Sequence, residues 1–216
     1  MFSLILEDCR RNGQIPTTQG FLNLKNLEYL DLSSNTFDNN ILQSIGTMTS
    51  LKTLILMSCK LDGQIPRAQG LCDLNHLQKL YMYDNDLNGF LPPCLANLTS
   101  LQQLDLSSNN LKIPMSLSPL YNLSKLKSFD GSGNEIFAEE DDHNLSPKFQ
   151  LESLSLRGRG QDAGALPKFF YHQSIFVAKE FSCEFVIPKY IHESLPRPNT
   201  FRNRSSFARV SSFTYV

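Results

Sequence analysis

The chain has 216 residues, of which 41% are hydrophobic and 19% charged, and this is enough apolar material for a folded core. Its formal net charge of −1 leaves no excess of basic side chains to neutralise phosphates, so we expect no nucleic-acid partner. No apolar run approaches the roughly 20 residues of a membrane-spanning helix, and the opening residues MFSLILEDCRR lack the basic start of a secretory signal, so we predict neither segment within this chain.

A leucine pattern repeats through the first three-quarters of the chain. LILEDCRRNGQIPTTQGFLNL at residues 4–24 recurs as LILMSCKLDGQIPRAQGLCDL at 54–74, and this offset spans two shorter units. The clearest units read Leu-x-x-Leu-x-Leu-x-x-Asn, and the units begin near residues 1, 27, 51, 77, 101, 126 and 151. Two leucines separated by one residue point the same way in an extended strand, so stacking the coils in parallel joins their leucines into one core.

The repeat predicts an α/β solenoid of about seven coils over residues 1–173. We expect a right-handed superhelix with short parallel strands on its concave side and irregular or 3-10 segments on its convex side. Gly131 replaces a core residue and Arg159 replaces a recurrent Asn, so we expect weaker burial towards the end of the array. Residues 174–216 show neither helical nor strand periodicity and are predicted to be a poorly ordered, non-repeat tail.

The recurrent Asn follows each strand where the chain turns sharply. Such a turn leaves buried backbone N–H and C=O groups unpaired, and an Asn amide offers two donors and an acceptor to satisfy them. We therefore predict a structural ladder with two small buried cysteines in the same slot, formed by Cys9, Asn35, Cys59, Asn85, Asn109 and Asn134.

The outward strand positions of two neighbouring coils differ from the rest. Most coils carry small or polar residues there, but one coil presents Ile55 and Met57, and the next presents Lys79, Tyr81 and Tyr83. Exposed aromatic and aliphatic side chains together are typical of binding hot spots, so these five residues are the predicted ligand-binding site on the concave face. Drift in an unused region, or packing against a flanking segment, is the alternative.

The sequence contains no pattern that indicates a catalytic, metal-binding or cofactor-binding site. The cysteines contain no Cys-x-x-Cys pair, and the acidic run Glu139–Asp142 with His143 is interpreted as a solvated loop. We predict a protein that is not an enzyme and holds no cofactor or metal. Cys72 and Cys94 lie in the convex halves of adjacent coils, either as a disulfide, which needs Cα atoms within about 7 Å, or as two buried thiols.

Four Asn-x-Ser/Thr sequons are candidate glycosylation sites: Asn97, Asn122, Asn144 and Asn203. The first two occupy equivalent phases of successive repeats, which places both on one exposed edge.

The Gly-Gln-Ile-Pro motifs at 13–16 and 63–66, with Leu-Asp-Leu-Ser-Ser-Asn at 30–35 and 104–109, resemble the plant extracellular subtype of leucine-rich repeat. Residues 69–111 resemble ectodomains of plant receptor-like proteins. The resemblance implies a plasma-membrane glycoprotein that binds a protein or peptide ligand, with a receptor kinase as co-receptor, in defence or developmental signalling. Because Met1 falls inside a unit, we expect this chain to be a truncated fragment of such an ectodomain.

Two other functions remain open at this point. Secreted polygalacturonase inhibitors share the repeat subtype, although the cysteine-rich caps of that family are not visible here. A truncated product without independent function is the third hypothesis.

Overall fold

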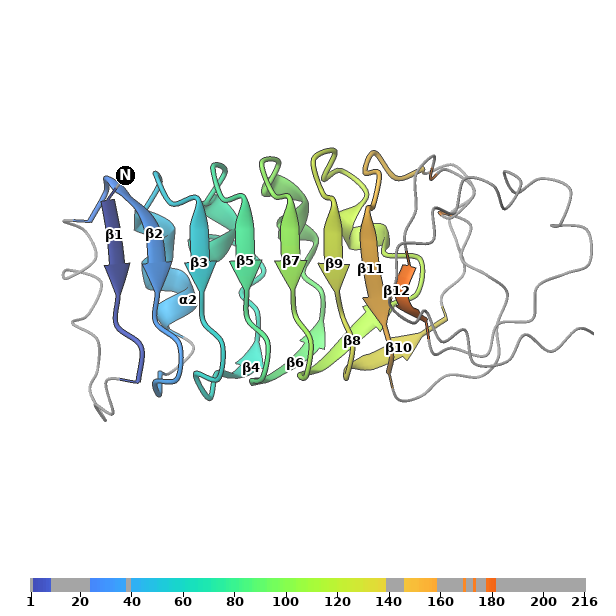
Figure 1. Cartoon of the computed structure of the whole chain (residues 1–216), viewed down its shortest axis with the longest axis horizontal. Helices are drawn as coiled ribbons and strands as arrows, with labels where there is room; N and C mark the ends of the chain where they lie inside the picture. Colours follow the sequence, from blue (N-terminus) through green and yellow to red (C-terminus); the bar gives the residue numbers. More distant parts are fainter. Residues whose placement is uncertain are drawn as a thin grey trace, which may run out of the picture.

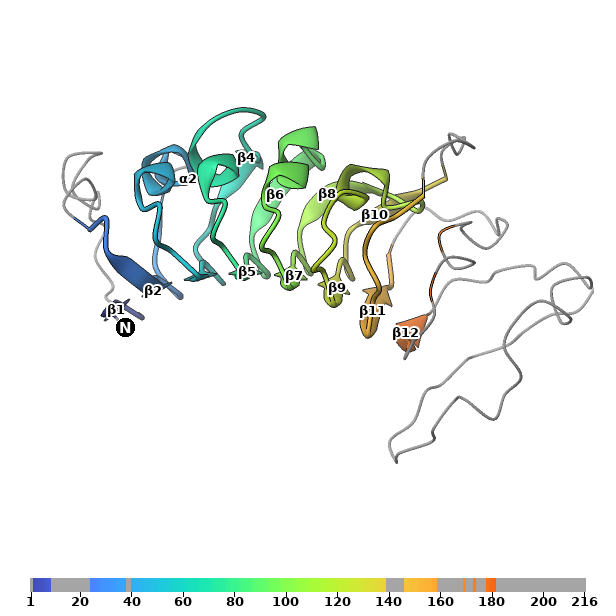
Figure 2. The ribbon, with the colours of Figure 1, turned by 90° about the horizontal axis from the view of Figure 1, so that it is seen from above.

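The chain forms an arc of stacked coils in a computed structural model that describes residues 2–8, 24–37, 40–138, 146–158, 169, 173 and 178–181. Figure 1 shows the main strands side by side across the length of the arc, and Figure 2 shows them on its concave side with the helical turns on the convex side. The predicted leucine-rich-repeat solenoid is confirmed.

The concave sheet holds eight parallel strands in the order β1-β2-β3-β5-β7-β9-β11-β12. Their bounds are β1 Phe2–Ile5, β2 Leu27–Asp31, β3 Thr53–Ile55, β5 Lys79–Tyr81, β7 Gln103–Asp105, β9 Ser128–Asp130, β11 Ser153–Leu156 and β12 Ala178–Phe181. Each of the seven predicted repeat units contributes one of the first seven strands.

The eighth strand extends the sheet past the predicted repeat boundary. We expected the array to end near Gln173, but β12 pairs in parallel with β11, with Leu154 opposite Ala178 and Leu156 opposite Phe181. Backbone pairing needs no Leu-x-x-Leu-x-Leu pattern, so this strand could not be predicted from the repeat. The rest of the predicted tail, residues 174–177 and 182–216, lies outside the described residues, and so does Arg159.

A second parallel sheet runs along one side of the arc, where we expected only irregular or 3-10 segments. Its order is β10-β8-β6-β4, and its bounds are β4 Asp62–Gln64, β6 Asp86–Phe90, β8 Asn110–Pro114 and β10 Glu135–Phe137. Gly63 and Gly89 lie in β4 and β6 with positive φ angles of 71° and 77°, a conformation that glycine adopts without steric cost. The Gly of the Gly-x-Ile/Leu-Pro motif therefore shapes this sheet.

The convex side is built from short helical turns, as predicted. They are α2 Ile41–Ser44, η1 Ile45–Thr47, η2 Gly70–Asp73, η3 Pro93–Asn97 and η4 Ser118–Leu120, where η marks a 3-10 helix. Adjacent turns pack closely at two glycines, because a Cβ built on Gly46 would lie 2.4 Å from the Cα of Gly70. Only residues without side chains allow the backbones to approach this far.

One hydrophobic core runs through all the coils between the concave strands and the convex turns. The inward strand positions, such as Leu30, Leu54, Leu80 and Leu104, are buried, since alternate side chains of each strand point to the same face. Full burial of one leucine stabilises a fold by about 1.5–3 kcal/mol, so the repeated leucines supply the main stabilisation of the array.

Burial does not weaken at Gly131, and that prediction was wrong. Phe129, Leu154 and Leu156 are each no more than 1% exposed. A Cβ added to Gly131 would lie 2.9 Å from Ile113 Cδ1 and 3.1 Å from both Phe129 Cζ and Leu156 Cδ2. The ring of Phe129, where other coils have Leu, occupies the volume that a side chain at Gly131 would fill.

Candidate ligand-binding face

The concave strands are held in register by asparagine side chains that bridge neighbouring coils. Asn85 Nδ2 donates to the carbonyl of Leu56 in the preceding coil at 2.8 Å and to Met82 in its own coil at 3.0 Å, while its Oδ1 accepts from the N–H of Cys59 at 3.0 Å. Asn35, Asn109 and Asn134 are also buried, and their amides donate in the same way to carbonyls of the preceding coil. This ladder fixes where each outward side chain stands.

Cys59 occupies an asparagine slot of the same ladder. Its Sγ lies 3.2 Å from the carbonyl oxygen of Leu32 in the preceding coil and 3.4 Å from that of Met57. Burial raises the pKa of the Cys59 thiol to about 11, and the charge of Asp31 adds to this effect, so the group is a neutral structural thiol at physiological pH. Cys9, the other predicted cysteine of the ladder, lies outside the described residues.

Three coils end their concave strands with the same side-chain turn. Asp105 Oδ1 accepts from the backbone N–H and the hydroxyl of Ser107 at 3.0 and 2.6 Å, and Asp130 Oδ1 accepts from Ser132 in the same way at 2.9 and 2.6 Å. Asp31 makes the equivalent pair with Ser33. In these coils, the Oδ1 atom of the outward aspartate accepts hydrogen bonds within the turn of its own coil.

The two middle coils replace this Asp-x-Ser turn with larger side chains. Ile55 and Met57 stand where Asp and Ser stand elsewhere, and the next coil has Tyr81 and Tyr83 at those positions. All four side chains are half-buried. The hydroxyl of Tyr83 donates to the Sδ of Met57 across the two coils at 2.6 Å. The four residues are therefore one contiguous apolar and aromatic surface, which we call the concave patch.

Polar and aromatic groups border the concave patch. Lys79 is exposed, and strand register places it between Thr53 and Gln103. The Tyr81 hydroxyl donates to the side-chain oxygen of Gln103. Tyr29 lies opposite Thr53 on β2 and is half-buried. Sequence reasoning left Tyr29 and Gln103 out of the site, although the outward phase of Tyr29 in its repeat was a signal for it.

Two titrating groups in and beside the patch have raised pKa values, mainly because they are partly buried. Burial raises the pKa of Tyr81, and the nearby charges of Asp105 and Tyr29 raise it further. Burial also raises the pKa of Asp105; the two hydrogen bonds from Ser107 oppose this effect, and the charge of Asp130 adds a smaller increase. Tyr81 is thus a neutral hydrogen-bonding aromatic group beside a carboxylate at physiological pH.

Two predicted glycosylation sites stand at matching places on the convex edge. The side chains of Asn97 and Asn122 are both exposed. The backbone carbonyl of each accepts a hydrogen bond from the backbone N–H two residues later, that of Thr99 at 2.8 Å and that of Ser124 at 2.9 Å. The two sequons therefore have the same local backbone geometry in successive coils. Asn144 and Asn203 lie outside the described residues, as does the acidic run 139–143.

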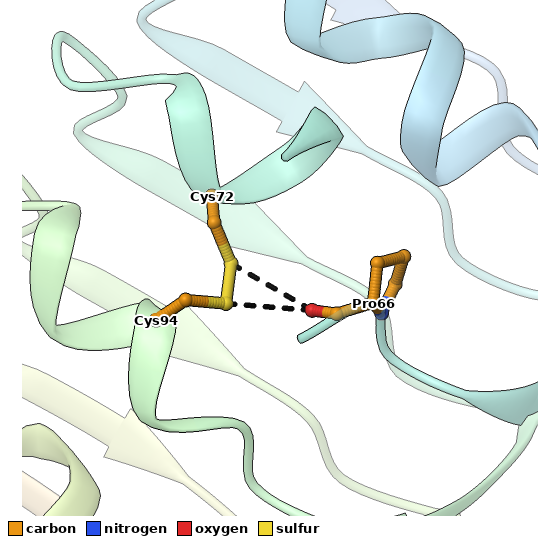
Figure 3. Close-up of a disulfide and its surroundings, with 3 residues drawn as sticks. All are labelled: Pro66, Cys72 and Cys94. Atoms are coloured by element: carbon orange, nitrogen blue, oxygen red, sulfur yellow. Dashed lines mark hydrogen bonds between the residues drawn. A yellow bond between two sulfur atoms is a disulfide. The ribbon is translucent and has the colours of Figure 1, made fainter. Parts of the chain in front are cut away.

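A disulfide joins the convex turns η2 and η3 through Cys72 and Cys94, whose Cα atoms are 5.7 Å apart (Figure 3). Both sulfur atoms approach the carbonyl oxygen of Pro66, at 3.8 and 3.4 Å. Disulfide sulfurs carry no proton, so these are close contacts and not hydrogen bonds. The bond links two adjacent coils on the face opposite the concave patch.

Within the part of the chain that the structure describes, no three His, Cys, Asp or Glu side chains gather in a way that could hold a metal ion. The helices found among those residues are all too short or too polar to cross a bilayer.

Comparison with known proteins identifies the repeat. The sequence model described as Leucine Rich Repeat matches residues 26–48, 76–98 and 100–120. No curated protein matches the chain.

Solved structures of plant receptors share the fold. The complex of PEPR1 with AtPEP1 is 27% identical over 86% of this chain, with a TM-score of 0.66. The plant peptide hormone receptor RGFR1 in complex with RGF2 is 26% identical over 77% of the chain, with a TM-score of 0.58. The BIR3–SERK2 complex from Arabidopsis thaliana is 28% identical over 65% of this chain and 71% of that one, with a TM-score of 0.50. The chain spans about a quarter of the length of the first two, covering 25% and 26% of them.

Proposed function

The chain is a leucine-rich-repeat solenoid similar to plant receptor ectodomains, and we propose that its concave face binds a protein or peptide ligand. The centre of this site is the concave patch with Lys79, that is, Ile55, Met57, Lys79, Tyr81 and Tyr83. The fold is a scaffold for protein interaction, and the relatives named above were solved with a bound peptide or with a second protein.

The observation that carries the proposal is the replacement of Asp-x-Ser by large side chains in the two middle coils. A coil that ends in Asp-x-Ser uses its outward groups to stabilise its own turn. The middle coils lack this side-chain turn and carry half-buried apolar and aromatic side chains at the same positions instead. Such side chains still offer part of their surface to a partner, as the anchor residues of binding sites do. Tyr29, Gln103 and Lys79 add polar groups at the border, as is common around an apolar binding surface.

The setting of this site in the plant is the finer part of the proposal. We place the chain on the extracellular side of the plasma membrane, in defence or developmental signalling, with a receptor kinase as co-receptor. The exposed sequons at Asn97 and Asn122 support exposure to the secretory pathway, because both asparagines are accessible and occur at the same phase of the repeat.

Binding measurements on the full chain, exported from plant cells and immobilised, test the proposal. The analytes are secreted plant peptides and ectodomains of plant receptor kinases, and the matched surface carries the double variant Tyr81→Ala with Tyr83→Ala. We expect at least one analyte to bind the parent chain and to lose that binding on the variant. Binding that is equal on both surfaces would show that the site is elsewhere, and a panel without any binder would contradict the function.

A further inference from the structure

The charges beside the concave patch indicate the chemistry of its ligand, an inference that rests on the proposed function. Strand register sets one row of outward positions across the sheet: Asp31, Ile55, Tyr81, Asp105 and Asp130. The apolar part of the patch therefore has a carboxylate on either side of it in the same row. Asp105 and Asp130 are direct neighbours on β7 and β9.

These carboxylates have no cationic partner among the described residues. The ion pairs found there join Lys52 to Glu28, Lys112 to Glu135 and Lys127 to Glu152, and none involves the row. Lys79 is the one basic residue at the outward positions of β2, β3, β5, β7 and β9, and it stands opposite Gln103 instead of an aspartate. The concave face around the patch is thus net negative.

Each carboxylate uses only part of its hydrogen-bonding capacity. The turn contacts of Asp105 and Asp130 both end on Oδ1, so the described residues leave Oδ2 open on each. Like charges directly opposite on neighbouring strands are destabilising. The pKa of Asp105 is raised mainly by burial, and the neighbouring charge of Asp130 adds a small increase. A cationic side chain of a ligand placed over this pair removes the repulsion and gains charge-assisted hydrogen bonds.

The spacing of the row fits an extended peptide. Neighbouring strands lie about 4.8 Å apart, so three intervals separate Asp31 from Asp105 by about 14 Å. An extended chain advances about 3.4 Å per residue, and residues i and i+4 of such a chain point the same way at about the same separation. The residue midway between them, i+2, also points the same way and falls over Ile55 and Tyr81.

We infer that the concave patch binds an extended peptide segment with an apolar side chain flanked by basic side chains two residues before and two residues after it. The apolar side chain packs on Ile55, Met57 and the two tyrosines. One basic side chain pairs with Asp31, and the other lies over Asp105 and Asp130 beside the ring of Tyr81, where a cation–π contact adds to the ion pair.

Three fluorescent peptides of equal length, with the cores Arg-Ser-Leu-Ser-Arg, Glu-Ser-Leu-Ser-Glu and Arg-Arg-Ser-Leu-Ser, test the spacing and the charge. We expect the first peptide to bind the full chain about tenfold more tightly than either of the others, as measured by fluorescence anisotropy. A difference in affinity of about tenfold is what two exposed ion pairs contribute. Its affinity should fall as the salt concentration rises, since exposed charges are screened. Equal affinities would overturn the inference.

Charge-removing variants locate the contact. Asp31→Asn with Asp105→Asn removes two charges but keeps an oxygen that accepts the turn hydrogen bonds, so the fold is retained and the preference for the Arg-flanked peptide should disappear. Asp62→Asn with Asp86→Asn makes the same charge change at exposed positions of the second sheet and should leave the preference unchanged.

The possible failures are distinguishable. If all peptides bind equally and Tyr81→Ala with Tyr83→Ala abolishes their binding, the inference is wrong and the proposed function stands. If none of these peptides binds, the inference is also wrong, and the panel of secreted peptides and ectodomains alone decides the proposed function.

Discussion

The side-chain oxygen of Asn85 accepts a hydrogen bond from the backbone N–H of Cys59, 26 residues earlier, at 3.0 Å. The same oxygen accepts from Leu61, and the amide nitrogen donates to the carbonyl of Leu56. The side chain of Asn85 therefore satisfies the turn of the preceding coil and links that coil to the one that contains Asn85. Because the patch residues Ile55 and Met57 flank the carbonyl of Leu56, the ladder also sets the geometry of the concave face.

Asn85→Ala should destabilise the fold strongly. The substitution leaves several buried backbone groups without a partner, and the free energy of unfolding should fall by about 3 kcal/mol, the cost expected for such groups. Urea denaturation followed by circular dichroism measures this. Asn88→Ala, at an exposed position of the same coil, is the control and should change stability little. Equal effects of the two substitutions would contradict the role of the ladder.

Cys59 should resist alkylation in the folded protein. Its pKa is raised to about 11, so the reactive thiolate is scarce at pH 8, and the group is also buried. In a chain carrying Cys9→Ser and Cys183→Ser, iodoacetamide should label Cys59 only after unfolding. Since the folded state holds this proton more tightly than the unfolded state, stability should decline as the pH rises from about 9 towards 11. Rapid labelling of the native protein at pH 8 would rule out the buried thiol.

Reduction of the Cys72–Cys94 bond should lower stability without changing the concave face. The bond closes a loop of residues separated by 22 positions, for which chain entropy gives about 3 kcal/mol. The oxidised chain and the variant Cys72→Ser with Cys94→Ser should therefore differ by a loss of this order in urea denaturation. Mass spectrometry of the exported protein, alkylated without reduction, should find neither cysteine modified; two alkylated cysteines would show that the bond does not form.

Glycans should occupy Asn97 and Asn122 in protein exported from plant cells. Both side chains are exposed at the same phase of successive coils, so both are accessible for glycosylation. Peptide mapping by mass spectrometry should show one glycan on each, and Asn97→Gln should remove only one of them. Unmodified asparagines in exported protein would be inconsistent with this assignment.

The sequence predicted the part of the fold that depends on side-chain periodicity. Pairs of buried apolar residues spaced by two, such as Leu30 and Leu32, mark most of the strands, because residues with this spacing share the buried face of a strand. It also predicted the ladder position of Asn85, since a buried turn needs a polar side chain there.

The remaining features depend on contacts that no local pattern encodes. The second sheet is formed by segments as short as Asp62–Gln64, where three residues give too little alternation to identify a strand. Strand β12 pairs through its backbone, and the volume above Gly131 is filled by Phe129, a residue that sequence periodicity places in the core without showing how far its ring reaches. The Tyr81–Gln103 contact of the site likewise joins coils that are adjacent only after stacking.

The central claim is that the ligand binds the concave patch and not another aromatic surface of the arc. The second sheet offers a matched control, because Phe90 is 55% exposed and stacks edge-on against Phe137, with ring centroids 5.6 Å apart. The most direct test is the dissociation constant of a partner from the panel for two double variants of the full chain, Tyr81→Ala with Tyr83→Ala and Phe90→Ala with Phe137→Ala. We predict that the first raises the Kd by about 100-fold or more, as loss of two hot-spot tyrosines does, and that the second leaves it within about twofold. An unchanged Kd for the tyrosine variant, or a larger increase for the phenylalanine variant, would contradict the account.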